Sequence, residues 1–174
     1  MATKMKIKIA SLPDRENLVA ELWDDKIQWC EISQETSDLI LEIYPHPTGK
    51  PWTFLFEEAF ACLQHAKRKL LGPDEPVPKP TMTTKMEITI ASLPDRENLV
   101  AELWYDNVLW CEISQEEEDL TLEIYPHPTG KPWTFPFGEA LTFLHQAKRK
   151  LINLDESAPK QTSSGTEIES PALI

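Results

Sequence analysis

Apolar and polar residues alternate along four short segments in the first part of the chain. These segments are Met5 to Ala10, Leu18 to Trp23, Ile27 to Ile32 and Leu39 to Tyr44. A period of two residues is typical of a strand with one buried face. The last three segments are joined by short polar turns, and connections that short require antiparallel neighbours. The pattern therefore predicts a four-stranded antiparallel sheet.

The period changes after the loop Pro45 to Trp52. Apolar side chains then recur three and four residues apart, which is the spacing of an amphipathic helix with one buried stripe. The residues at this spacing are Phe56, Ala59, Phe60, Leu63, Lys67, Leu70 and Leu71. A helix of this length can lie across four strands. The fold class expected is α+β, a ββββα domain with its helix on one face of the sheet.

The whole domain occurs twice in the chain. A shift of 81 positions aligns residues 1–75 with residues 82–156, and 55 of the 75 pairs are identical. In the second copy Pro136 replaces Leu55, and proline is tolerated in the first turn of a helix but not further in, so the helix should begin near residue 55. We predict one copy over residues 1–71, a linker over 72–81, a second copy over 82–153 and a tail over 154–174.

The two connecting segments differ from the copies in composition. The linker contains four prolines, which fix φ and remove backbone donors, so we expect a semi-rigid extended connector. The tail has little apolar content and no period, so it cannot bury enough surface to offset its ordering entropy. We expect the tail to be disordered.

The charge balance bounds the partners. The net charge is −12, with −4 on residues 1–75 and −8 on residues 82–156. This balance disfavours nucleic acid and anionic membranes and suits a basic protein partner, although acidity can also serve solubility alone. Three cysteines do not pair within each copy, and the chain has no apolar signal or membrane-spanning run. We expect a reduced, cytoplasmic protein.

Strand parity divides the side chains between two faces. One face is apolar and should meet the helix: Met5, Ile7, Ile9, Leu18, Ala20, Leu22, Cys30, Ile32, Leu39, Leu41 and Ile43. The other face is mixed and open, and it groups aromatic with acidic residues. We take these as candidate partner-binding residues: Glu21, Trp23, Trp29, Glu31, Glu42 and Tyr44 in the first copy, and Glu102, Trp104, Trp110, Glu112, Glu123 and Tyr125 in the second.

Three arrangements compete for this open face. It binds a partner, or it is covered from within, by packing of copy 1 against copy 2 or by the linker or tail. In the third arrangement, a bulge in the third strand turns Trp29 inward and breaks up the aromatic cluster.

Catalytic chemistry has little support in the sequence. His46 and His127 lie in identical proline-rich loops without a nucleophile at a motif spacing, so we expect those loops only to turn the chain. Cys30 and Cys111 are expected to be buried apolar residues, and no zinc motif is present. The turn Asp14 to Glu16 is expected to be solvated, with at most a local ion pair. We predict no catalytic residue, no metal and no cofactor.

The sequence thus favours a non-enzymatic, acidic protein-binding module that holds a basic partner on its open sheet faces, as an inhibitor, antitoxin or immunity protein would. A second hypothesis is a small-ligand or carbohydrate binder in which the aromatic rings stack on sugars. A third is a purely structural tandem domain.

Overall fold

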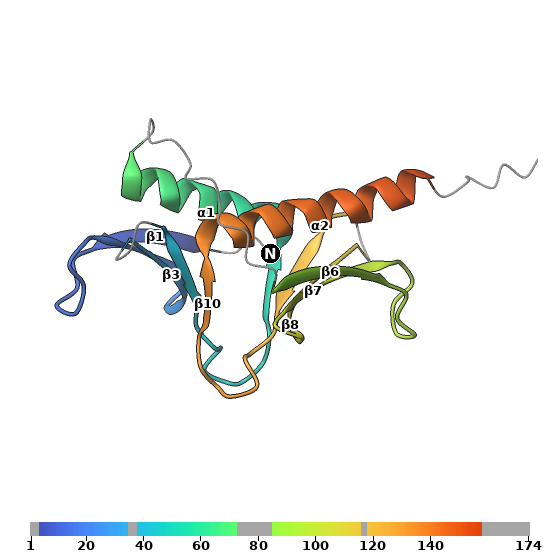
Figure 1. Cartoon of the computed structure of the whole chain (residues 1–174), viewed down its shortest axis with the longest axis horizontal. Coiled ribbons are helices and arrows are strands. Elements are labelled where there is room, and N and C mark those ends of the chain that lie inside the picture. The colour runs from blue at the N-terminus through green and yellow to red at the C-terminus, as the bar shows by residue number, and fades with distance from the viewer. Residues whose placement is uncertain (1–3, 35–37, 73–84, 116–117, 158–174) are drawn as a thin grey trace, which may run out of the picture.

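The computed structural model describes residues 4–34, 38–72, 85–115 and 118–157. Residues 73–81 of the predicted linker and 158–174 of the predicted tail lie outside this described part. Two antiparallel sheets carry two helices on one side (Figure 1), so the α+β class is confirmed. Each sheet has five strands rather than the four expected.

The two copies have the same order of elements. The first contains β1 (Met5–Ala10), β2 (Val19–Asp24), β3 (Ile27–Ser33), β4 (Ile40–Ile43), β5 (Trp52–Leu55) and α1 (Phe56–Leu71). The second contains β6 (Met86–Ala91), β7 (Val100–Tyr105), β8 (Val108–Ser114), β9 (Thr121–Ile124), β10 (Trp133–Pro136) and α2 (Phe137–Ser157). The start of α1 agrees with the position expected from Pro136. The second helix continues to Ser157, beyond the predicted end of the copy.

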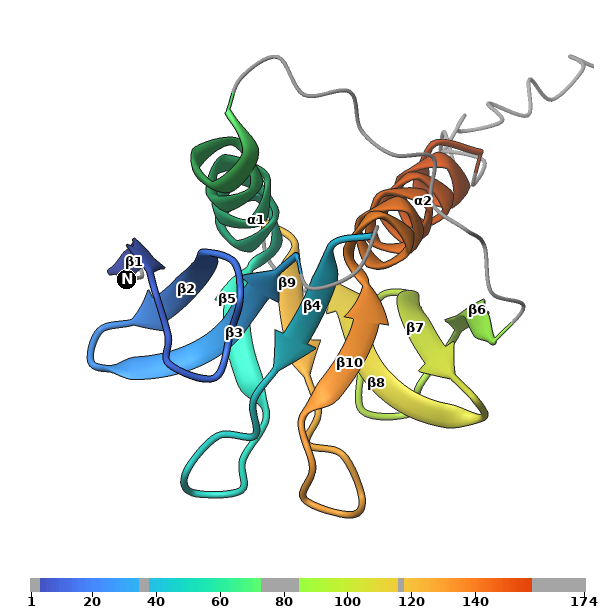
Figure 2. The ribbon, with the colours of Figure 1, turned by 60° about the vertical axis from the view of Figure 1, so that its left-hand side comes forward.

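The fifth strand of each sheet comes from the other copy. One sheet has the order β1-β2-β3-β4-β10 and the other β5-β9-β8-β7-β6 (Figure 2). Trp133 pairs with Ile43 on β4, and Trp52 pairs with Ile124 on β9. The segments Trp52–Leu55 and Trp133–Pro136, expected to be loop and helix start, are therefore strands exchanged between the copies. The copies associate through this exchange.

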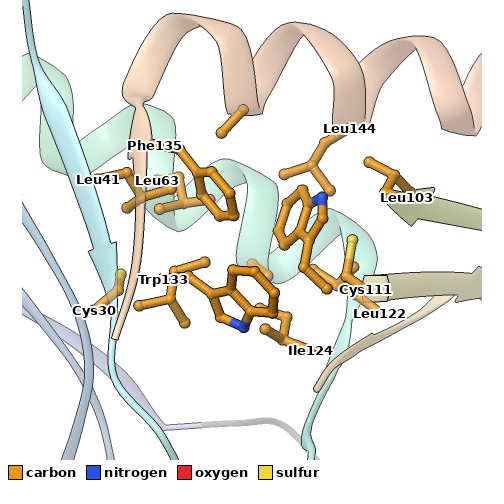
Figure 3. Packing of buried hydrophobic residues seen from close by; sticks show 14 of the residues in the cluster. Cys30, Leu41, Leu63, Leu103, Cys111, Leu122, Ile124, Trp133, Phe135 and Leu144 are labelled. Atoms are coloured by element: carbon orange, nitrogen blue, oxygen red, sulfur yellow. The ribbon is translucent and has the colours of Figure 1, made fainter. Parts of the chain in front are cut away.

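The exchange creates a core that the described parts of both copies share. Phe135 and Trp133 of β10 lie between Leu41 and Leu63 of the first copy and Leu122 and Ile124 of the second (Figure 3). Trp52 and Phe54 occupy the equivalent places in the other sheet and are 4% and 2% exposed. Each helix nevertheless packs on the first two strands of its own copy. Each copy thus contributes its last strand to the other copy's sheet and packs its helix on its own sheet, which holds the two copies together.

Two positions depart from the face assignment by parity. Leu18 is 52% exposed because β2 begins only at Val19, which is buried. Trp29 is fully buried, because Leu22 pairs with Cys30 while Trp23 pairs with Gln28. Trp29 is therefore the extra residue of a β-bulge, which turns its ring inward. The same shift places Trp110 in the core of the second copy.

Candidate functional site

Three carboxylates lie side by side across the open face of each sheet. In the first copy Glu21 is opposite Glu31, and Glu31 is opposite Glu42. Glu102, Glu112 and Glu123 form the same row in the second copy. Like charges directly opposite each other on neighbouring strands are destabilising. Each row therefore requires a nearby cation to offset the repulsion among its carboxylates.

An arginine from the turn before β2 supplies that cation. Arg15 Nη2 lies 3.1 Å from Glu31 Oε1 and 2.9 Å from Glu42 Oε2. Arg96 repeats the arrangement at 3.0 Å from Glu112 and 3.1 Å from Glu123. The expectation of a solvated turn with only local ion pairs is wrong here, because the turn folds under the sheet and pairs across 27 positions of the chain. The first turn of each copy thus covers the centre of the open face.

The aromatic residues that remain on this face bind the same carboxylates. Tyr44 Oη donates a hydrogen bond to Glu31, and Trp23 Nε1 donates one to Glu21, both at 3.3 Å. Burial raises the pKa of Tyr44, and the nearby charges of Glu31 and Glu42 raise it further. The phenol therefore stays protonated and remains a donor.

The central carboxylate of each row is the most buried. Glu31 and Glu112 are each 3% exposed. Desolvation raises the pKa of Glu31, and the positive charge of Arg15 only partly opposes this effect. The pKa of Glu112 is raised for the same reason, opposed by Arg96. The folded protein thus binds a proton at these groups more readily than the unfolded chain does.

This direction predicts how the two central carboxylates make stability depend on pH. When folding raises the pKa of a carboxyl, the folded state binds more protons than the unfolded state. The protein then becomes more stable as the pH falls toward the pKa of the unfolded chain, and less stable as the pH rises. Wild type should therefore gain stability relative to Glu31→Gln/Glu112→Gln when the pH is lowered from about 7 to about 5. Urea unfolding of both proteins across this range measures the difference. A difference that stays constant with pH contradicts the prediction.

The open face of the second copy differs from that of the first at two positions on its edge strand. In the first copy Lys8 lies opposite Glu21, and its Nζ is 3.7 Å from that carboxylate. The equivalent residue in the second copy is Thr89, which cannot form the pair, and Lys6 is replaced by Glu87. At these equivalent positions, the first copy has Lys6, Lys8 and Arg15 with three glutamates, and the second has Arg96 with four. The formal charge of these residues is thus zero in the first copy and −3 in the second.

A hollow lies at these positions on the second face. It has a volume of about 200 Å³ and is lined by Glu87, Thr89, Trp104 and Asn107. Trp104 is half-buried, and across the ladder it pairs with Glu87. The hollow therefore combines an aromatic ring with a carboxylate, and Glu102 lies directly opposite Thr89.

All the candidate binding residues except Trp29 and Trp110 lie on the two open faces, one group on each face. Trp29 and Trp110 are in the core. Trp29 packs on Phe54 of β5, and Trp110 packs on Phe135 of β10. Sequence reasoning missed Arg15 and Arg96. The row of carboxylates predicted by strand parity was a signal that a cation must lie over it.

The histidines and cysteines considered for catalysis make contacts that hold the fold together. His46 Nδ1 accepts a hydrogen bond from the backbone N–H of Thr48 at 3.2 Å, and its ring packs edge-on against Trp52. Gly49 adopts a φ of 75° in this loop, a conformation that favours glycine. Cys30 and Cys111 are buried, and burial raises the pKa of both thiols. Within the described residues, no three potential metal ligands come together.

No protein-family model, curated protein or solved structure matches this chain significantly. None of the helices in the described ranges is both long and apolar enough to cross a membrane.

Proposed function

We propose that this protein is an acidic protein-binding module, and that its principal contact is the open face of the second copy. The partner is a basic protein that inserts a lysine or arginine side chain into the hollow beside Trp104. The observation that carries this proposal is the replacement of Lys8 by Thr89. It leaves Glu102 without the cation that Glu21 has in the first copy.

The first copy indicates how such a cation would be held. There Lys8 approaches Glu21 from the neighbouring strand, and Trp23 donates to the same carboxylate. In the second copy a partner's ammonium or guanidinium group would take the place of the Lys8 ammonium. Glu102 and Glu87 supply negative charge, and the face of Trp104 supplies a cation–π contact. The equivalent position in the first copy is thus already occupied by the protein's own Lys8.

The charge of the whole chain supports the same partner. A net charge of −12 steers a basic protein toward the surface and speeds its association. The charge is also concentrated in the second copy, where the open face has its uncompensated carboxylates. In this proposal the first copy completes the second sheet through β5 and does not provide an equal second binding site.

Exchange of the edge residues between the copies tests the proposal. We expect tetralysine peptide to shift the NMR signals of Glu87, Thr89 and the Trp104 indole, with little effect at Lys6, Lys8 and Trp23. Thr89→Lys should abolish these shifts, because the new ammonium would pair with Glu102. Lys6→Glu/Lys8→Thr should create the same response on the first face. Raising the salt from about 0.05 to about 0.5 M should weaken binding.

One control and three possible results would decide against the proposal. Tetraserine peptide has no charge and should produce no shifts at either face. Equal binding on both faces of the wild type, or full binding by Thr89→Lys, would show that the missing lysine does not define the site. Binding that is insensitive to salt would favour uncharged stacking on the tryptophan, as a carbohydrate would make.

A further inference from the structure

The two helices lie on the side of the molecule opposite the open faces (Figure 2). A groove lies between them, lined by residues of both. Its volume is about 540 Å³, within the range of small-molecule sites. Phe60, Leu71 and Leu141 contribute apolar surface to it, and Lys67, Arg68 and Arg149 contribute positive charge. None of the described residues that line the groove is acidic. The groove is thus a local cationic site on an acidic protein.

The two ends of the helix pair are not equivalent. Where α1 begins, Glu57 forms an ion pair with Lys148, which also lies 5.7 Å from the centre of the Phe56 ring. Phe60 and His145 approach each other beside this pair, with ring centres 6.1 Å apart. An internal carboxylate therefore satisfies the lysine at this end.

The duplication places a lysine without such a carboxylate at the other end. By the shift of 81 positions Lys67 corresponds to Lys148, while Gly138 corresponds to Glu57. Both Lys67 and Gly138 line the groove. Among the described residues, Lys67, Arg68 and Arg149 take part in none of the ion pairs of the structure. Burial lowers the pKa of Lys67, and the adjacent Arg68 lowers it further, so an anion here would relieve both effects.

We propose that the groove binds a small amphipathic carboxylate. The ligand's carboxylate takes the position beside Lys67 that a glutamate at position 138 would occupy, with Arg68 and Arg149 adding positive charge. Its apolar body covers the ring of Phe60 and the side chains of Leu71 and Leu141. Charge-assisted hydrogen bonds fix the head group, and burial of the apolar body supplies the rest of the affinity. This site is independent of the proposed basic-protein face.

Decanoate, kept below its micelle concentration, is the probe for this site. Calorimetry should detect its binding to the full chain, and NMR should place the shifted amides at Lys67, Gly138 and Arg149. Acetate, which lacks the apolar body, and decyltrimethylammonium, which reverses the charge, should not bind. Tighter binding of hexaglutamate than of decanoate would overturn the assignment to a small amphiphile.

Gly138→Glu is the decisive variant, because it supplies the missing carboxylate from within. It should weaken decanoate binding at least about tenfold, the scale of one lost charged contact. Gly138→Ala is the matched control, since it adds a side chain without charge and should leave binding within about threefold of wild type. Lys67→Gln should weaken binding about as much as Gly138→Glu.

Two results would overturn the groove proposal. One is decanoate binding that Gly138→Glu and Lys67→Gln leave unchanged while circular dichroism shows both variants folded. The other is a set of shifted amides that lies away from the two helices. Thr89→Lys should not alter decanoate binding, so failure at the groove and failure at the open face can be told apart.

Discussion

The first copy produced alone, as residues 1–72, should be a folded dimer and not a folded monomer. In the full chain its β4 edge is completed by β10 of the second copy, and its own β5 completes the other sheet. Trp52 and Phe54 are buried there against residues of both copies. A core of about 70 residues is marginal alone, so a second molecule should provide the exchanged strand.

The segment between β4 and β5 leads β5 onto the other sheet. Residues 44–51 turn at His46–Gly49, where the Gly49 N–H donates to the His46 carbonyl, and Pro45, Pro47 and Pro51 restrict φ in and around this turn. Light scattering coupled to size-exclusion chromatography should give twice the mass of the fragment. Circular dichroism should show loss of structure on dilution, because folding depends on association.

Substitutions on opposite faces of β5 provide the matched control. Phe54 is 2% exposed and Thr53 is exposed, so only the first side chain contributes to the shared core. Phe54→Asn should leave the fragment largely unfolded, whereas Thr53→Asn should leave the dimer intact. A fragment that remains a folded monomer at every concentration would mean that β5 can pair with its own β4.

Arg15→Ala should have the largest effect on stability among single changes to the open face of the first copy. The substitution removes the cation that lies between Glu31 and Glu42 and leaves a nearly buried carboxylate without it. Breaking a buried pair from one side costs about 3 kcal/mol. For a chain of this size the melting temperature should fall by roughly 6 to 12 °C. Thermal and urea unfolding measure both quantities.

The carboxylate itself provides the test of mechanism. Arg15→Ala/Glu31→Gln should recover part of the lost stability, because the double variant no longer buries an unpaired charge. Arg15→Lys keeps the charge but loses the planar fork, so it should fall between wild type and Arg15→Ala. Arg96→Ala should behave as Arg15→Ala does. If the Glu31→Gln change only adds to the damage, the loss comes from packing and not from the buried charge.

Much of the local structure could be predicted because it depends on neighbours in the sequence. The alternation of Met5 to Ala10 indicated β1, and the stripe from Phe56 to Leu71 indicated α1. Pro136 indicated the start of the second helix to within one residue: it ends β10, and α2 begins at Phe137. The acidic residues of the candidate site were also grouped correctly, because strand parity requires only the count of residues along each strand.

The position of Trp29 shows where parity fails. A bulge exists only relative to the partner strand, so the run from Ile27 to Ile32 contains no local signal that distinguishes it from a regular strand. The cation over the carboxylate row is a similar case. Arg15 lies 27 positions from Glu42, and only the path of the turn under the sheet brings them together.

The sequence by itself determined that one α+β domain occurs twice, where its helices begin, and which copy has the greater negative charge. The tertiary structure alone decided which copy receives each fifth strand. Residues 41–54 are identical to residues 122–135, so three of the four residues of β5 would meet the same side chains on β4 as on β9. The exception is Leu55, which pairs with Thr121 on β9 and would meet Ile40 on β4, so local pairing alone does not favour β9. The difference lies in the tertiary arrangement, in which each helix packs on the first two strands of its own copy while the strand before it pairs with the other copy's sheet.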